Sequence, residues 1–513
     1  MVKTFSRRAA LVGGAALSLT SLSSRAQTQP TALKIAAPFE ITGFDPVRSG
    51  FIFGRLEIAE TLVTADDGGR PVSALASSWT VSDDGLLWRF TLRSGAIFHD
   101  GTSVTAGTVA NALNRTRGVA ASVLANAPIA AIGADGDRIV TIRTERPFQS
   151  LPAFLSHSSG IVLAPSSFEG DSAVRAIGSG PYRARLVEAP LRVEAELFPG
   201  WTGPKPTIER ISYLAVPRGE TRTIMAESGQ ADLVYVLPPE SVDRLRRSTR
   251  IAVEVIPIAR TRAIKLNAAR PAFSDVRTRQ AFSFAIDREG IAKALLRSPR
   301  SQATQMFAPA LADWHQPGLP ALAHDPARAR ALLAEAGWRP GTDGVLAKNG
   351  QPFKVTLRTF SDRPEQPPMA AAIQAQVKEV GIDMQVAIVN SGEIPAGHRD
   401  GTMDMALFAR NFALTPDPLG TLLQDFGPNG GDWGAMNWSS PELVSVLGRL
   451  GSETDAAARS ALRRRTSEIL HAEMPVVPIA WFDHGVAVSR RLSGVTIDPF
   501  ELSYRVSAMR WGA

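Results

Sequence analysis

The sequence SDDGLLWRFTLR occupies residues 82–93 and places a turn directly before a strand. Residues 83–85 are Asp-Asp-Gly, a combination that tolerates the backbone angles of a tight turn. Trp88, Phe90 and Leu92 then alternate with polar residues. This period of two predicts a strand that buries one apolar face.

Helix and strand patterns alternate on either side of this block. Residues 105–116 have the pattern of a helix, and residues 353–360 and 370–380 give a further strand and helix. The clearest helix covers residues 325–337, which begin with Asp-Pro and end in Gly. Aspartate caps a helix start, proline suits its first turn, and glycine suits a left-handed stop. The alternation predicts an α/β fold.

Length and composition narrow the function classes. The chain has 513 residues, which suggests two to four domains, and it has no cysteine. Disulfides, cysteine-ligated zinc, thiol catalysis and a lipidated cysteine are therefore excluded. The net charge is +7, but the basic residues are scattered, and even the densest groups, 244–247 and 463–465, are short. A nucleic-acid binder concentrates its bases, so we expect no nucleic-acid partner.

The first 26 residues have the order of an export signal. A basic start is followed by a weakly apolar stretch, and Ser24 and Ala26 precede a cleavage point after residue 26. The stretch is too short to span a bilayer stably. Arg7 and Arg8 resemble the pair of a twin-arginine signal, although Ala10 stands where the fullest form has Phe. We expect a soluble periplasmic protein without a lipid anchor and with a net charge of about +3 after cleavage, because four bases are removed.

Several blocks together resemble one family. They are residues 62–115, which include PVSALASSW at 71–79 and FHDGT at 98–102, GSGPY at 178–182, residues 275–288 and 324–338, and the pair Asp417-Pro418. In this order they resemble the bacterial extracellular solute-binding proteins of family 5, the peptide- and nickel-binding proteins of ABC importers. The resemblance covers essentially everything after residue 30.

The resemblance implies a fold and a way of working. The expected fold is the α/β, two-lobed periplasmic binding protein fold of type II, with an extra subdomain on lobe I and a hinge of two crossing strands near Lys265 and Ala480. A ligand that touches both lobes stabilises the closed state, which a permease can then recognise. The expected partners are a small-molecule, chelate or peptide ligand and an ABC permease in the inner membrane, and the protein is expected to be a monomer without a cofactor. The expected domains are 1–26 signal peptide, 27–50 lobe I, 51–164 extra subdomain, 165–265 lobe I, 266–480 lobe II and 481–513 lobe I.

Motifs for catalysis or a metal site are missing from the sequence. It contains no His-Glu-x-x-His, no Gly-x-Ser-x-Gly elbow and no Walker A loop, and its histidines are not at metal-ligand spacing. His99 and Asp100 are interpreted as parts of a structural turn rather than a catalytic pair. We therefore expect no enzyme. The alternatives are a peptide-binding chaperone or receptor and, less favoured, an extracytoplasmic hydrolase.

The ligand stays open among a nickel or other metal chelate, a peptide and another small organic molecule. Peptide-binding relatives hold the peptide ammonium with an Asp four residues before the Pro of the Asp-Pro pair, and here Leu414 stands there. Nickel-chelate relatives stack aromatic side chains on the ligand, and Phe412 matches one such position. Arg410 lies close by and can hold a carboxylate through two parallel hydrogen bonds. We expect an anionic or chelating ligand rather than a free-amine peptide.

The predicted binding residues follow from where these segments should meet in the cleft. Phe51 and Ile52 are placed on an early loop, and Trp433 and Trp438 beside the Gly-rich stretch 427–432. The full set is Phe51, Ile52, Arg410, Asn411, Phe412, Leu414, Trp433 and Trp438.

Overall fold

The computed structural model describes residues 32–361, 363–412, 415, 417–427 and 431–512. The predicted signal peptide lies outside these ranges. Alternating helices and strands confirm the predicted α/β class. Among the described residues, no helix is both long and apolar enough to cross a membrane.

The largest sheet in the described ranges has ten strands in the order β10-β11-β12-β1-β13-β21-β14-β20-β18-β19. Strand β1 runs parallel to β12 and β13, and β18 runs parallel to β19 and β20. The strands are β1 (Leu33–Ala37), β10 (Tyr182–Glu188), β11 (Arg192–Leu197), β12 (Arg210–Ala215), β13 (Leu233–Tyr235), β14 (Ile251–Leu266), β18 (Lys354–Phe360), β19 (Asp383–Val389), β20 (Met405–Asn411) and β21 (Val476–Ser489).

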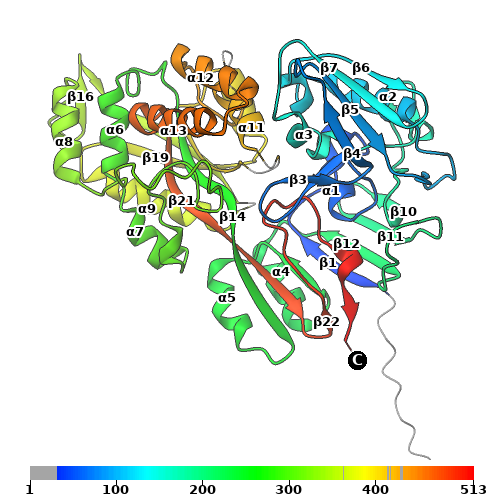
Figure 1. Cartoon of the computed structure of the whole chain (residues 1–513). Helices are drawn as coiled ribbons and strands as arrows, with labels where there is room; N and C mark the ends of the chain where they lie inside the picture. The colour runs from blue at the N-terminus through cyan, green and yellow to red at the C-terminus, as the bar shows by residue number, and fades with distance from the viewer. Residues whose placement is uncertain (1–31, 362, 413–414, 416, 428–430, 513) are drawn as a thin grey trace, which may run out of the picture. The chain divides into compact units, whose positions relative to one another are not determined.

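Strands β14 and β21 form a long antiparallel pair in the middle of this sheet (Figure 1). At one end β21 pairs with β13, and at the other end β14 pairs with β20 from Arg260 to Leu266. The β14–β21 register shifts between Ile258 and Thr261, where the neighbouring strands change. The two halves of the sheet are therefore joined through both strands. The predicted hinge at Lys265 and Ala480 stays a prediction, and the change of neighbours on β14 occurs a few residues before Lys265.

Residues 76–144 form a separate antiparallel sheet in the order β4-β5-β7-β6, covered by helix α2 (Ala106–Arg117). Its strands are β4 (Ala76–Val81), β5 (Leu87–Leu92), β6 (Ile129–Asp135) and β7 (Ile139–Thr144). Strand β5 confirms the alternation seen in the sequence, since Trp88, Phe90 and Leu92 are all buried. Gly85 has φ +71°, the left-handed angle that glycine adopts without a steric penalty.

Capping residues determine where two helices begin in the C-terminal half of the chain. Asp275 accepts a hydrogen bond at the start of α6 (Val276–Phe284), and Asp325 does the same for α8 (Pro326–Glu335). Gly337, just after α8, has φ +93°, as the predicted left-handed stop requires. The predicted helix 370–380 is α9 (Gln366–Lys378), which begins earlier than expected.

The other helices and strands are short or lie outside the main sheets. The helices are α1 (Pro46–Arg55), α3 (Leu151–Phe154), α4 (Gly219–Ser228), α5 (Pro239–Arg246), α7 (Arg288–Gly290), α10 (Glu393–Arg399), α11 (Leu419–Phe426), α12 (Pro441–Ser452) and α13 (Ala456–Glu473). The strands are β2 (Val63–Ala65), β3 (Pro71–Ser73), β8 (Phe168–Glu169), β9 (Ser172–Ala173), β15 (Arg339–Pro340), β16 (Leu346–Lys348), β17 (Gln351–Pro352), β22 (Leu492–Ser493) and β23 (Arg510–Trp511).

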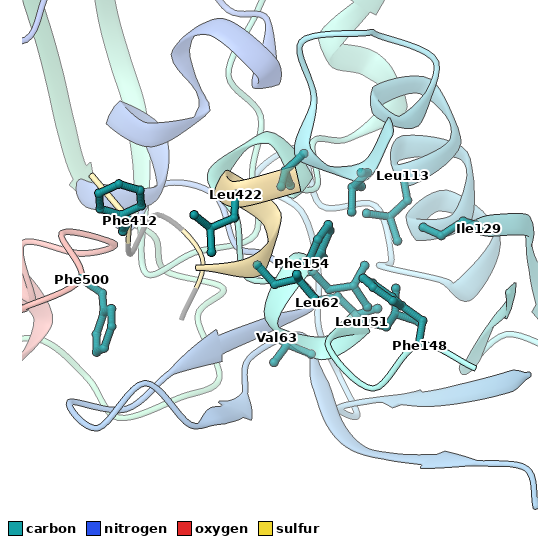
Figure 2. Packing of buried hydrophobic residues seen from close by; sticks show 14 of the residues in the cluster. Leu62, Val63, Leu113, Ile129, Phe148, Leu151, Phe154, Phe412, Leu422 and Phe500 are labelled. Atoms are coloured by element: carbon teal, nitrogen blue, oxygen red, sulfur yellow. The ribbon is translucent and has the colours of Figure 1, made fainter. Parts of the chain in front are cut away.

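One hydrophobic core connects the four-stranded sheet with helices α11 and α12. Phe148 and Phe154 belong to it, together with Leu422 of α11 (Figure 2). Leu419 of α11 belongs to it as well. A methyl group added at Gly420 of α11 would lie 3.1 Å from the Phe154 ring and from Val123. Helix α11 therefore approaches the subdomain closely, and glycine is the residue that leaves room for it.

Candidate ligand-binding cavity

A cavity of about 480 Å³ opens at the carboxyl ends of strands from both halves of the main sheet. Residues 38–40 follow β1, Phe360 and Arg363 end and follow β18, and residues 390–391 follow β19. In open α/β sheets, ligands bind outside the carboxyl ends of the strands. The full lining is Pro38, Phe39, Glu40, Phe51, Pro217, Arg260, Phe360, Arg363, Asn390, Ser391, Ala409, Arg410, Asn411 and Trp433.

Two aromatic pairs line this cavity, one from each half of the sheet. Phe39 and Phe51 meet edge to face with ring centres 6.2 Å apart, and Phe360 and Trp433 meet similarly at 6.4 Å. Rings in this arrangement hold each other in place and offer apolar surface to a ligand.

Arginines supply the positive charge of the cavity. Arg260 is 4% exposed and donates from Nη2 to Glu501, but no described residue accepts from its Nε or Nη1. The side chain of Arg363 makes no hydrogen bond or ion pair within the described part of the chain. Its Cζ lies 5.8 Å from the ring centre of Phe39 and 5.4 Å from that of Phe482. Burial lowers the pKa of Arg260 to about 9, so Arg260 remains charged at neutral pH. Burial also lowers the pKa of Arg363 from its ordinary value.

Glu501 is the central acid beneath these arginines. It accepts from Arg260 and from Asn411 Nδ2 (2.9 Å), and Arg55 Nη2 lies 3.8 Å from its Oε1. Burial alone would raise the pKa of Glu501, but the charges of Arg260 and Arg55 outweigh this effect and lower the pKa to about 2. Glu501 also has φ +56°, an uncommon backbone angle that costs energy outside glycine. The fold therefore holds an ionised carboxylate here at the expense of local backbone strain.

Arg410 lines the cavity, but its guanidinium is already paired. It donates to Asp425 through Nε (2.6 Å) and Nη2 (2.8 Å), and Nη2 also reaches Gln424 at 3.2 Å. The carboxylate that Arg410 was expected to take from a ligand is supplied by the protein itself. Asp425 is buried, with a side chain 2% exposed, rather than a surface acid.

The predicted binding residues divide into four that line the cavity and others that do not. Phe51, Arg410, Asn411 and Trp433 line it. Leu414 lies outside the described residues. The other three residues, Ile52, Phe412 and Trp438, are buried or bonded elsewhere.

Ile52 and Phe412 are core residues. Ile52 lies in helix α1 and not on a loop, as does Phe51, so that expectation was wrong. The same helix crosses the predicted boundary between residues 50 and 51. Phe412 packs on Phe307 at 5.4 Å, and Trp438 donates from Nε1 to Glu473 at 2.9 Å. Neither Phe412 nor Trp438 is among the residues that line the cavity.

Sequence reasoning missed Phe39, Arg260, Arg363 and Glu501. A signal for Arg260 existed: the run from Ile258 to Leu266 carries three basic residues among apolar ones, and the structure buries the whole run. Buried cations need partners, so such a strand marks a polar site. Glu501 had no local signal, because it reaches Arg260 and Asn411 from a C-terminal segment far away in sequence.

The His99–Asp100 pair makes the contacts of a structural turn. His99 Nε2 lies 3.0 Å from the carbonyl oxygen of Gly180, and its ring meets Phe198 edge to face. Asp100 accepts from Ser166 and Thr102. In the described ranges, no group of three or more His, Cys, Asp or Glu side chains could hold a metal ion.

Comparison with known proteins gives consistent matches. The family model described as "Bacterial extracellular solute-binding proteins, family 5 Middle" matches residues 70–433. The nickel-binding periplasmic protein of Escherichia coli K12 is 27% identical over 90% of this chain and 93% of its own length. The glutathione-binding protein GsiB of Escherichia coli O1:K1 is 25% identical over 83% of this chain and 84% of its own length.

A solved structure supports the same fold. NikA from Brucella suis, in complex with Fe(III)-EDTA, superposes with a TM-score of 0.83 at 24% identity, covering 94% of this chain and 99% of that chain. The predicted two-lobed binding-protein fold is thereby confirmed.

Proposed function

Because the chain belongs to the bacterial extracellular solute-binding proteins of family 5, we propose that it captures a small ligand in the periplasm and delivers it to an ABC permease. The observation that carries this proposal is the cavity lined from both halves of the main sheet. A ligand there contacts both halves only when they are close together. It therefore stabilises the closed state by its differential affinity.

The two long strands β14 and β21 are the natural hinge, since they join the two halves of the sheet. In the proposed domain scheme, lobe I and its subdomain lie on one side of these strands and lobe II on the other. Closing and opening about a few strand residues is a common way to enclose a ligand. The closed form is the one that the permease recognises.

Residues 1–26 are proposed to direct export by the twin-arginine route, and the mature protein is proposed to be a soluble monomer that binds without a cofactor and without turnover. The ligand classes left open by the sequence are a metal chelate, a peptide and another small organic molecule. A peptide-binding chaperone is the second class of function, and it predicts a preference for unfolded chains over small ligands.

Small-angle scattering and thermal unfolding test the proposal together. The probes are glutathione, a nickel–histidine chelate, unmodified di- and tripeptides, and small organic acids. We expect one class to reduce the radius of gyration and to raise the melting temperature. A ligand at 100 times its Kd adds about 2.7 kcal/mol to the free energy of unfolding.

Two outcomes would contradict this function. A probe that binds at saturation and changes neither the radius of gyration nor the melting temperature argues against closure around the cavity. Chemical conversion of the bound probe, followed by mass spectrometry, would show an enzyme instead.

A further inference from the structure

Lys265 is a buried lysine behind the wall of the cavity. It lies on strand β14, its side chain is 0% exposed, and it is not among the residues that line the cavity. In the described part of the chain it forms no ion pair with a carboxylate. Burying a cation without such a partner is costly, and an apolar side chain of similar volume would fill the same space without that cost.

The ammonium of Lys265 joins two other segments to strand β14. Its Nζ donates to the backbone carbonyl oxygen of Asp432 at 2.9 Å and to Nδ1 of His398, near the end of α10, at 2.6 Å. Burial, followed by the charge of Lys265, lowers the pKa of His398 to about 4, so at neutral pH its ring is uncharged and one ring nitrogen is an acceptor. An ammonium can only donate, so both bonds run from Lys265 outwards.

Both segments that Lys265 holds form part of the cavity wall. Asn390 lies just before α10, lines the cavity and accepts a backbone hydrogen bond from Glu393 in the first turn of that helix (2.9 Å). Trp433 directly follows Asp432, lines the cavity and packs on the Phe408 ring, with ring centres 6.0 Å apart. The lysine is therefore one contact away from two lining segments.

The backbone on the other side of Trp433 has an anchor of its own. The N–H of Ala435 donates to the carbonyl oxygen of Asp425 in α11 at 3.1 Å. Gly434 lies so close to α11 that an added side-chain carbon would come within 2.0 Å of the same oxygen. Trp433 thus lies between an anchor on α11 and the bond from Lys265, and two such anchors fix the direction in which its ring points.

The other charged groups around Lys265 come from the elements packed against it. Asp425 of α11 is paired with Arg410 of β20, and Asp432 is paired with Arg399 of α10. The second pair is exposed, with side chains 61% and 39% exposed for Arg399 and Asp432, and such pairs contribute little. Burial is the largest influence on Lys265 and lowers its pKa to about 7, while the charges of Asp425 and Asp432 oppose this shift. Lys265 therefore changes charge close to neutral pH.

We propose that Lys265 is a positioning residue of the cavity: it holds helix α10 and the Asp432–Trp433 segment on strand β14 and so places the Trp433 ring where a ligand packs. This inference rests on the proposed function, because it concerns the wall of the same cavity. Lys265 acts through Trp433 and does not contact the ligand. The variant Lys265→Met tests it, since methionine is unbranched and adaptable and fills the space while removing both hydrogen bonds.

Fluorine NMR of protein labelled with 5-fluorotryptophan tests the positioning without any ligand. The chain has nine tryptophans, and Trp433→Phe identifies the resonance of Trp433. We expect this resonance to shift or broaden in Lys265→Met. The urea midpoint should not fall, because the variant also removes the cost of a buried ammonium. An unchanged Trp433 resonance in Lys265→Met overturns the inference, and with a lowered urea midpoint it would make Lys265 a structural residue only.

A pH titration of the wild type is a second measurement that needs no folded variant. The Trp433 resonance should move with a midpoint near pH 7, where Lys265 loses its charge, and Lys265→Met should abolish this movement. His398 does not interfere, because its pKa is about 4. A wild-type Trp433 resonance that stays constant between pH 5.5 and 8.5 contradicts the proposal.

Two further variants are matched controls. Lys354→Met removes an exposed lysine from β18 of the same sheet and should leave the Trp433 resonance in place. Arg399→Gln removes the exposed ion pair on the same segment and should move the resonance much less than Lys265→Met does. If Arg399→Gln moves it as far, the exposed pair positions the segment and the inference fails.

Binding measurements separate this inference from the proposed function. The probes are glutathione and the nickel–histidine chelate, titrated by calorimetry into the wild type and Lys265→Met. A probe that compacts the wild type in solution scattering should bind the variant at least tenfold more weakly. Equal binding of that probe to both proteins leaves the binding-protein function standing and overturns the inference. If neither probe binds the wild type while the Trp433 resonance responds as expected, the positioning role stands and the proposed function fails for these two ligands.

Discussion

At the scale of single residues, the charge that the cavity presents depends on which arginine side chain lacks an ion-pair partner. Arg410 and Arg363 both line it, yet Arg410 is held by a buried carboxylate and Arg363 by ring faces alone. A paired guanidinium gives shape to the wall, whereas an unpaired one gives affinity for an anion. The number of arginines in a binding segment therefore predicts anion binding less well than the location of their counter-ions does.

Arg410→Ala tests this distinction through stability. Removing Arg410 leaves Asp425 buried without its partner, which costs on the order of 3–5 kcal/mol in the free energy of unfolding. Urea unfolding of this variant should show that loss, whereas Arg89→Ala should change stability by less than about 1 kcal/mol, since its pair is exposed. Full stability with weaker ligand binding would show instead that Arg410 contacts the ligand directly.

At the scale of helices and strands, the periodicity and the capping residues of short segments were sufficient to predict individual elements. The alternation at 88–92 gave β5, and the capping residues of α6 and α8 gave their starts. The position of Phe51 and Ile52 was missed because the start of α1, capped by Asp45, was interpreted as part of a loop. Caps and periodicity act within a few residues, so they define elements well but do not reveal what those elements pack against.

The packing of α11 on the subdomain is such a long-range contact, and Gly420→Leu tests it. A side chain at residue 420 meets Phe154 and Val123, and overpacking of this kind costs about 1–3 kcal/mol. If the proposed lobes separate when the cleft opens, this cost falls on the closed state. We expect weaker ligand binding and a larger radius of gyration for the liganded protein, with the secondary structure unchanged.

Gly448→Leu is the matched control for Gly420→Leu. Gly448 lies in helix α12, and a side-chain carbon there has nothing within 4 Å. This variant should bind ligand and close like the wild type. If Gly420→Leu behaves in the same way, the contact between α11 and the subdomain is not part of closure.

At the scale of the whole molecule, the site is assembled from segments that are distant in sequence. Arg55 donates to the backbone of Glu501, 446 residues away, and Arg260 pairs with the same residue from 241 residues away. No pattern within one segment reports such a pairing. This is why the sequence predicted the fold and four lining residues but not the free arginine or the buried acid beneath it.

Acid stability is also a property of the whole chain. Burial lowers the pKa of four histidines, His99, His157, His398 and His484, from 6.5 to about 4. Between these values the unfolded chain binds more protons than the folded chain. Stability is therefore fully present above pH 6.5 and is lost as the pH falls towards 4. Each of the more deeply buried histidines, His99, His157 and His484, accounts for up to about 3 kcal/mol, and half-buried His398 for less, because solvent screens its charge.

His99→Gln isolates one share of this acid sensitivity. Glutamine can still donate to the carbonyl of Gly180, as His99 does, but it does not take up a proton between pH 4 and 6.5. Urea unfolding at pH 7.5, 5.5 and 4.5 should show a smaller loss of stability on acidification for this variant than for the wild type. His324→Gln, which changes an exposed histidine, should follow the wild type at every pH. An identical pH slope for His99→Gln and the wild type would mean that the turn at His99 opens before its ring is protonated, and that the acid sensitivity arises elsewhere in the chain.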